Sequence, residues 1–382
     1  MSRPSDLPEG GAPPGPPGTW GQPPAGASPR APGGGSLPAE ASPLRVPAVV
    51  AAGEGPGSRK VYGENKVYLA LDGRALVAHV VATLQRVPEV SEVLVVGNAE
   101  RLDRVLGDPA FRSELTKPLR IVPQFRNLYE NCWEAYRRLL PGAPPEGRDP
   151  VTEEDRDLRV LYLSGDLPFA TAQEISDFIR RAADTGADFV MGSVEREALE
   201  PFARGDGDRP AIRVAFFNLA EGRLRQNNLF LVRPGRLGNR QSIEEMYEHR
   251  YQKQLGNILA LAWRLFWSRG GGPRVLFFYA LMHLAGVADR HGWRRLSDWL
   301  RHFVPLVRVE RAVGALLDTR FRVLVTSVGG CGIDIDREAE YDAARARYRE
   351  WRRQQEERAL ELHGPLPLPA RAGEPRASEE GV

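Results

Sequence analysis

The sequence predicts an α/β protein in which a mostly parallel sheet is covered by helices on both faces. Short apolar stretches typical of buried strands alternate along the chain with longer stretches of helical spacing. The alternation begins and ends inside the chain, because both ends are rich in proline, glycine and polar residues. We therefore expect one folded region, residues 44–363, between disordered tails at 1–43 and 364–382.

The elements of this region can be placed from apolar periodicity and from the residues that start and stop helices. Residues 45–52, 75–87 and 91–98 read as a strand, a helix and a strand, which is a βαβ unit. In the next helix but one, Thr171 is the expected N-cap and Gly186 the expected stop. The later elements alternate in the same way: helix 126–140, strand 158–166, helix 171–186, strand 187–194, strand 322–328 and a long helix from about residue 338.

Composition excludes several classes of protein. The formal net charge of the 382 residues is +2, and basic and acidic residues are interspersed, so no nucleic-acid-binding surface is indicated. Cys132 and Cys331 are the only cysteines, which is too few for a disulfide framework and does not form a Cys/His metal pattern. The N-terminus lacks the apolar segment of a signal peptide. A protein of the reducing cytoplasm fits these observations.

A mainly helical insertion is expected at residues 238–319. It includes two long helical stretches, at 242–267 and 294–317, whose Trp and Phe residues we expect in the core. The apolar stretch Val275 to Ala288 is shorter than the roughly 20 residues that cross a bilayer. It therefore predicts a buried helix and no transmembrane segment, with contact at a membrane surface as the alternative.

Acidic residues stand at the ends of two predicted strands. Asp166 follows the strand in "LYLSGDLPFAT", and ligands of open α/β sheets bind outside the carboxyl ends of strands. A lone Asp there fits a helix cap or an ordinary loop residue equally well. Asp334 and Asp336 follow another strand, and side-chain alternation puts both on one side of an extended segment. Two such acidic points can hold Mg²⁺ through oxygen ligands, although "IDID" alone also fits a turn with a cap.

These motifs together resemble those of the MobA-like nucleotidyltransferases, a family that includes the molybdenum-cofactor guanylyltransferases. "VPAVVAAGEG" and "GENKVYLALDGRALVAHVVATL" are similar to the opening strand, small-residue loop, lysine and "GRPLV" helix start of that family. Further along, "SGDLP", "RQNNLFLVRP" and "GIDIDREAEYDAA" are similar to its Gly-Asp-x-Pro, Gly-Asn and closing Asp-Val-Asp segments. The resemblance spans residues from about 45 to 350, with the motifs in the family's order.

The resemblance implies a Rossmann-like, nucleotide-diphospho-sugar transferase fold and transfer of a nucleoside monophosphate from an NTP to a small phosphorylated acceptor. Asp166 and Asp336, supported by Asp334, would bind Mg²⁺, and Lys66 would neutralise charge on the phosphates. The acceptor would be a sugar phosphate or a cofactor precursor and would contact Asn228. The residues that match nucleotide-binding positions are Ala52, Gly53, Gly55, Lys66, Asn131 and Gly165.

Departures from the family pattern keep alternatives open. The first loop reads "AAGEGPGSRK", with Glu54 inside it and Arg59 displaced, and Asn227 replaces a glycine. Lys66 alone also fits a solvated surface lysine, and Asn131 alone fits a helix cap or an exposed amide. The rival functions are a glycosyltransferase of the related fold and a degenerate nucleotide-binding scaffold. The single Asp of "SGDLP", where such a glycosyltransferase usually has Asp-x-Asp, favours nucleotidyl transfer.

Overall fold

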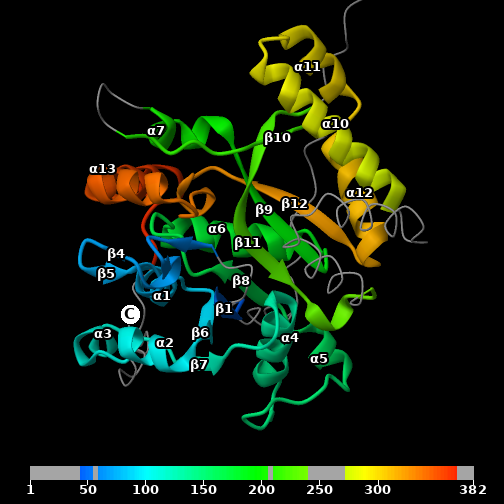
Figure 1. The fold of residues 1–382 in the computed structure, drawn as a ribbon. Helices are drawn as coiled ribbons and strands as arrows, with labels where there is room; N and C mark the ends of the chain where they lie inside the picture. The colour runs from blue at the N-terminus through cyan, green and yellow to red at the C-terminus, as the bar shows by residue number, and fades with distance from the viewer. Residues whose placement is uncertain (1–43, 55–58, 205–209, 240–271, 368–382) are drawn as a thin grey trace, which may run out of the picture. The chain divides into compact units, whose positions relative to one another are not determined.

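A central sheet organises the protein in a computed structural model that describes residues 44–54, 59–204, 210–239 and 272–367 (Figure 1). Its strand order is β12-β9-β11-β8-β1-β6-β7, and β10 pairs with β11. The strands are β1 (Val46–Ala52), β6 (Val90–Gly97), β7 (Leu119–Pro123), β8 (Val160–Ser164), β9 (Phe189–Glu195), β10 (Phe217–Asn218), β11 (Arg223–Val232) and β12 (Phe321–Thr326). Two short hairpins, β2 (Lys60–Val61) with β3 (Glu64–Asn65) and β4 (Ala70–Leu71) with β5 (Arg74–Ala75), follow β1.

The sheet is mostly parallel, as predicted. β1 pairs in parallel with β6 and β8, and the pairs β6–β7 and β12–β9 are parallel too. β11 runs antiparallel to β8, β9 and β10. The carboxyl ends of β1 and β8 therefore meet at one edge of the sheet.

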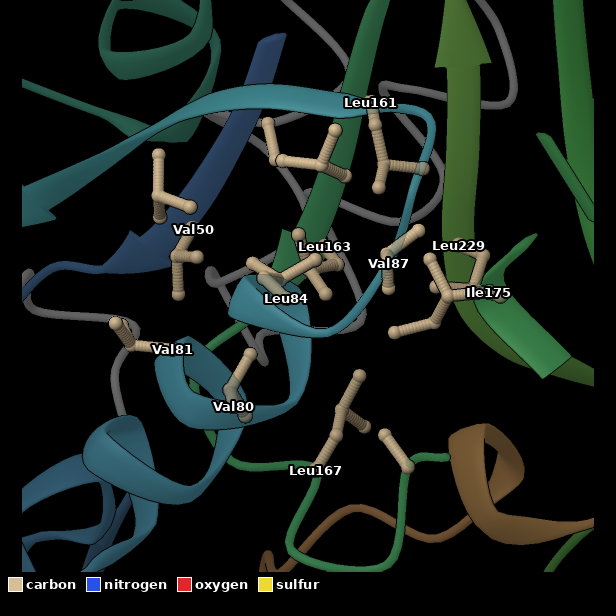
Figure 2. Packing of buried hydrophobic residues seen from close by; sticks show 14 of the residues in the cluster. Val50, Val80, Val81, Leu84, Val87, Leu161, Leu163, Leu167, Ile175 and Leu229 are labelled. Atoms are coloured by element: carbon tan, nitrogen blue, oxygen red, sulfur yellow. The ribbon is translucent and has the colours of Figure 1, made fainter. Parts of the chain in front are cut away.

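Helices cover both faces of the sheet, so the predicted three-layer arrangement, a sheet between two layers of helices, is confirmed. On one face α1 and α6 pack Val81, Leu84 and Ile175 against Val50 and Leu163 of the central strands (Figure 2). On the other face α4 contributes Ala135 and Tyr136 to a second cluster with β1, β6 and β8. The helices are α1 (Leu76–Gln85), α2 (Ala99–Leu106), α3 (Pro109–Ser113), α4 (Leu128–Leu139), α5 (Glu153–Asp157), α6 (Ala172–Asp184), α7 (Glu200–Ala203), α10 (Gly272–Arg290), α11 (Arg294–His302), α12 (Leu306–Leu317) and α13 (Glu338–His363).

Short polar side chains cap several of these helices. The hydroxyl of Thr171 accepts a hydrogen bond from the backbone N–H of Glu174 at the start of α6, as predicted. Gly186, just beyond the end of α6, has a φ of 66°, a conformation that glycine adopts without strain. Asn98, Asn127 and Thr152 cap α2, α4 and α5 in the same manner.

The helical insertion departs from the prediction in one respect. The stretch Val275 to Ala288 does form a helix, α10, but it is not a buried one. Phe278, Ala285 and Ala288 are buried, whereas Phe277 and Leu284 are more than half exposed. Helical spacing predicted an apolar helix, but it could not show whether other elements pack on all of its sides. Among the described residues, only one side of α10 is covered. The expected helix at 242–267 lies in a range that the structure does not describe.

The same correction applies to the aromatic residues of the insertion. Trp299 and Phe303 were expected in the core, yet they are 59% and 40% exposed. Trp351 of α13, outside the insertion, is fully buried and packs on Phe169 and Phe202. Within the described ranges, none of the helices combines the length and apolar content that a membrane span requires.

Candidate active site

Asp166 lies in the loop directly after β8 and has no exposed surface. The backbone N–H of Gly165 donates to the carbonyl of Ala51 at 2.9 Å, and a Cβ at Gly165 would lie 3.2 Å from that oxygen. The loop therefore passes close against β1 and its last residue, Ala52. Because Thr171 caps α6, the helix-cap alternative for Asp166 is excluded.

Asp334 and Asp336 reach the same place from the loop that follows β12. Ile333 and Ile335, which alternate with them in the sequence, are fully buried, so the two carboxylates lie on the opposite side of the segment, as alternation predicted. One carboxylate oxygen from each of Asp166, Asp334 and Asp336 lies within 4.8 Å of the others. Residues 168 positions apart in sequence thus form one acidic cluster.

Lys66 enters this cluster from a short 3-10 helix (Lys66–Tyr68), whose cap is Asn65. Its Nζ lies 2.5 Å from an oxygen of Asp166 and 2.5 Å from an oxygen of Asp336. Only 17% of the side chain is exposed, so Lys66 is not a solvated surface lysine. Burial lowers its pKa, but the charges of the two carboxylates outweigh burial and raise the pKa above its ordinary value.

Two arginines complete the charge pattern. Arg59, the displaced arginine of the first loop, contacts Asp336 at 2.6 Å, and Arg225 of β11 contacts Asp334 at 2.5 Å. Burial, together with the charge of Asp166, raises the pKa of Asp334, whereas Lys66 overcomes burial and lowers the pKa of Asp336. Sequence reasoning missed Arg225. The available signal was an arginine inside a strand two residues before the Asn pair.

The first loop lies against α4. A Cβ at Gly53 would lie 3.1 Å from the side-chain nitrogen of Asn131, so the loop backbone passes close to that amide. Asn131 is buried and accepts a hydrogen bond from the N–H of Phe125, while Asn127 caps α4, which excludes the cap alternative for Asn131. Gly55 lies outside the described residues.

The carboxylate of Glu54 is held by Arg101. Arg101 Nη1 lies 2.9 Å from Glu54 Oε1, and the guanidinium also contacts Glu64 and stacks over the ring of Tyr68. The backbone N–H of Glu54 donates to Gln124. The acidic residue that set this loop apart from the family therefore has its charge neutralised by a neighbouring helix, α2.

The two asparagines of β11 have different surroundings. Asn227 is fully buried, donates to Thr326 and would overlap any side chain at Gly192. Asn228 is half-buried and has a φ of 56°, inside a register shift of β11. Because Leu229 pairs with Leu163 of β8, Asn228 lies at the sheet edge that carries Asp166.

The fold that carries this edge of the sheet is shared with known proteins. Residues 48–228 match the family model of the MobA-like NTP transferase domain. A solved structure of a hypothetical transferase from Thermus thermophilus is 22% identical and aligns with a TM-score of 0.51 over 78% of this chain and 99% of that one. The fold is thus the nucleotide-diphospho-sugar transferase fold that the sequence predicted.

One curated relative is similar over a shorter range. The 2-C-methyl-D-erythritol 4-phosphate cytidylyltransferase of Halalkalibacterium halodurans is 27% identical over 139 residues. The match covers 36% of this chain and 54% of that enzyme, so the chain spans about half the length of the relative.

Proposed function

We propose that the protein is a Mg²⁺-dependent nucleotidyltransferase of the cytoplasm that transfers a nucleoside monophosphate from an NTP to a small phosphorylated acceptor. The observation that carries the proposal is the arrangement of Lys66 between Asp166 and Asp336 at the carboxyl edge of the sheet. Phosphoryl chemistry needs positioning and charge neutralisation more than covalent participation by the protein. A buried lysine among carboxylates at a ligand-binding edge provides both.

The donor set of this cluster fits Mg²⁺. Asp166, Asp334 and Asp336 offer carboxylate oxygens, the ligand type that Mg²⁺ prefers, and these atoms lie within 4.8 Å of one another. Asp166 and Asp336 would bind the ion directly, with Asp334 in support. When bound, the ion would neutralise phosphate charge and orient the phosphates.

The proposed reaction exchanges one phosphorus–oxygen bond for another. An oxygen of the acceptor attacks the α-phosphorus of the NTP in line, and the bond to the departing pyrophosphate breaks. Lys66 remains an ammonium ion, because its pKa is raised, and neutralises negative charge on the phosphates. No side chain of the cluster needs to become covalently linked to the substrate.

The neighbouring residues divide between the two substrates. Ala52, Gly53, Asn131 and Gly165 surround the end of β1, and we assign them, with Gly55, to the nucleotide. Asn228 lies at the same edge on the other side of β8 and is assigned to the acceptor. Since the curated relative is a cytidylyltransferase for a sugar-alcohol phosphate, CTP is the first donor to test and a sugar phosphate the first acceptor class.

A substrate screen tests this function. Each of the four NTPs is incubated with phosphorylated acceptors, with and without Mg²⁺, and pyrophosphate release is followed. We expect pyrophosphate only with an NTP, an acceptor and Mg²⁺ together. Turnover of sugar nucleotides alone would select the glycosyltransferase alternative, and nucleotide binding without either reaction would select the scaffold. The neutralised Glu54 argues against the scaffold, since the altered loop does not place a free negative charge beside the site.

A further inference from the structure

Exposed apolar side chains are concentrated on the helical insertion. Of the fourteen large apolar residues that are exposed in the described part of the chain, nine lie between residues 277 and 307. In Figure 1 this region is α10 and α11, which lie side by side, and the start of α12. We call its exposed apolar residues the hairpin surface, represented by Phe277, Leu284, Val287, Trp293, Trp299 and Phe303.

The spacing of these residues gives each helix an apolar stripe. On α10, Phe277 and Leu284 are seven residues apart and Val287 follows three residues later, so the three share one side of the helix. On α11 and just beyond it, Trp299 and Phe303 are four residues apart and their rings are in edge contact at 5.0 Å. Ser297 and Leu300 are the buried residues of α11 and lie on its other side.

The same region is strongly basic although the whole chain is almost neutral. Residues 272–312 contain seven arginines, no lysine and three acidic residues. All three acidic side chains are in ion pairs: Asp289 with Arg223, Asp298 with Arg301 and Glu310 with Arg322. Some exposed arginines of this surface, among them Arg294 and Arg295, are therefore not paired with an acidic residue of the hairpin.

We propose that the hairpin surface binds the surface of a membrane that contains anionic lipid. Tryptophan is enriched at the membrane–water interface, and helices that lie in that interface combine apolar aromatic stripes with arginine or lysine. The charge complementarity points to anionic headgroups. A second copy of this chain is a poorer occupant, because symmetric pairing would bring like-charged arginines together. This binding is peripheral and independent of the proposed transfer reaction.

Vesicle flotation of the full-length protein tests the proposal. The probes are vesicles of phosphatidylcholine alone and of phosphatidylcholine mixed with phosphatidylglycerol. We expect binding to the mixed vesicles, weakening as salt is raised, and little binding to phosphatidylcholine. Replacing both tryptophans, Trp293→Ala with Trp299→Ala, should weaken binding about tenfold or more. Reversing two charges, Arg294→Glu with Arg295→Glu, should do the same, since each basic residue near an anionic surface contributes about fivefold.

Matched controls come from α13, away from the hairpin. Leu360→Ala removes a half-exposed apolar side chain and Arg353→Glu reverses an exposed arginine, and both should bind vesicles like the wild type. Nucleotidyl transfer to a water-soluble acceptor should be unchanged in all these variants. Absence of flotation, or equal loss in the controls, overturns the proposal. A dimer in solution that the hairpin substitutions dissociate, without vesicle binding, would overturn it in favour of self-association.

Discussion

At the scale of single residues, Asp166 is the sharpest test of the site. Asp166→Asn keeps the size of a side chain that has no exposed surface and leaves Lys66 paired with Asp336. The fold should therefore survive, while Mg²⁺-dependent turnover should fall by about a hundredfold to a thousandfold. Melting temperature and turnover across a Mg²⁺ titration are the measurements. Asp149→Asn, which changes an exposed carboxylate that pairs with Arg137 and is not part of the cluster, is the control, and near-normal turnover in Asp166→Asn would remove most of the case for catalysis.

The partner carboxylate gives a second prediction. Asp336→Asn should lower turnover to a similar degree, and the double variant should be little worse than either single one, because both residues serve one ion and one lysine. A double-mutant cycle on turnover measures the coupling. Independent, multiplying losses would show that Asp166 and Asp336 do not act as a unit.

Glu174 is a residue that no sequence signal selected. It is buried at the start of α6, where it accepts hydrogen bonds from the hydroxyl of Thr326 and the backbone N–H of Cys331. These bonds join α6 to β12 and to the loop that carries Asp334 and Asp336. Burial raises the pKa of Glu174 to about 7. The residue lies 152 and 157 positions from its partners in sequence, so neither periodicity nor motif spacing could reveal it.

From the raised pKa of Glu174 we predict how the stability of the protein depends on pH. A carboxyl whose pKa is raised in the folded state favours folding below its unfolded value of 4.5, and this stability is lost as pH rises toward 7. Glu174→Gln cannot ionise, so its free energy of unfolding relative to the wild type should increase through this window, by up to about 3 kcal/mol. Denaturant unfolding of both proteins at several pH values measures the difference. A difference that does not change between pH 4.5 and 7 would contradict a buried, titrating Glu174.

At the scale of elements, the two loops that carry the carboxylates are fitted to each other. Gly330 packs so closely on the loop after Asp166 that a Cβ would lie 2.0 Å from the carbonyl oxygen of Phe169. Gly330→Ala must therefore shift backbone, which should cost about 1–3 kcal/mol and displace Asp334 and Asp336 from Asp166. The melting temperature and the turnover of this variant should both fall. Gly222→Ala, where nothing lies within 4 Å of the added Cβ, should leave both unchanged, and equal effects in the two variants would contradict the close fit.

Helices and strands could be predicted where the sequence signals that define them lie within a few residues of one another. The βαβ unit, the cap at Thr171 and the stop at Gly186 are confirmed because strand composition, helical spacing and capping act within a few residues. The exposure of α10 could not be predicted in this way. Periodicity shows that an apolar stripe exists, whereas burial depends on partners elsewhere in the fold.

The candidate site could be predicted only where its residues follow local signals. Asp166, Asp334 and Asp336 come after strands, so it could be inferred from the sequence that these carboxylates meet at the sheet edge. The pairing of Arg225 with Asp334 could not be inferred, because it depends on β11 running antiparallel beside β9, where Arg225 pairs with Val194. Nor could the neutralisation of Glu54, since Arg101 reaches it from α2 across 47 residues of sequence.

At the scale of the whole molecule, the last prediction concerns where the folded unit begins. Residues 1–42 are rich in proline and glycine and have few apolar residues to bury, whereas β1, from Val46, is paired on both sides in the middle of the sheet. Deleting residues 1–42 should therefore leave the melting temperature and turnover nearly unchanged. Deleting residues 1–52 removes β1, including the fully buried Val50, and should abolish cooperative unfolding. A large loss of stability in the shorter deletion would show that the tail contributes to the fold.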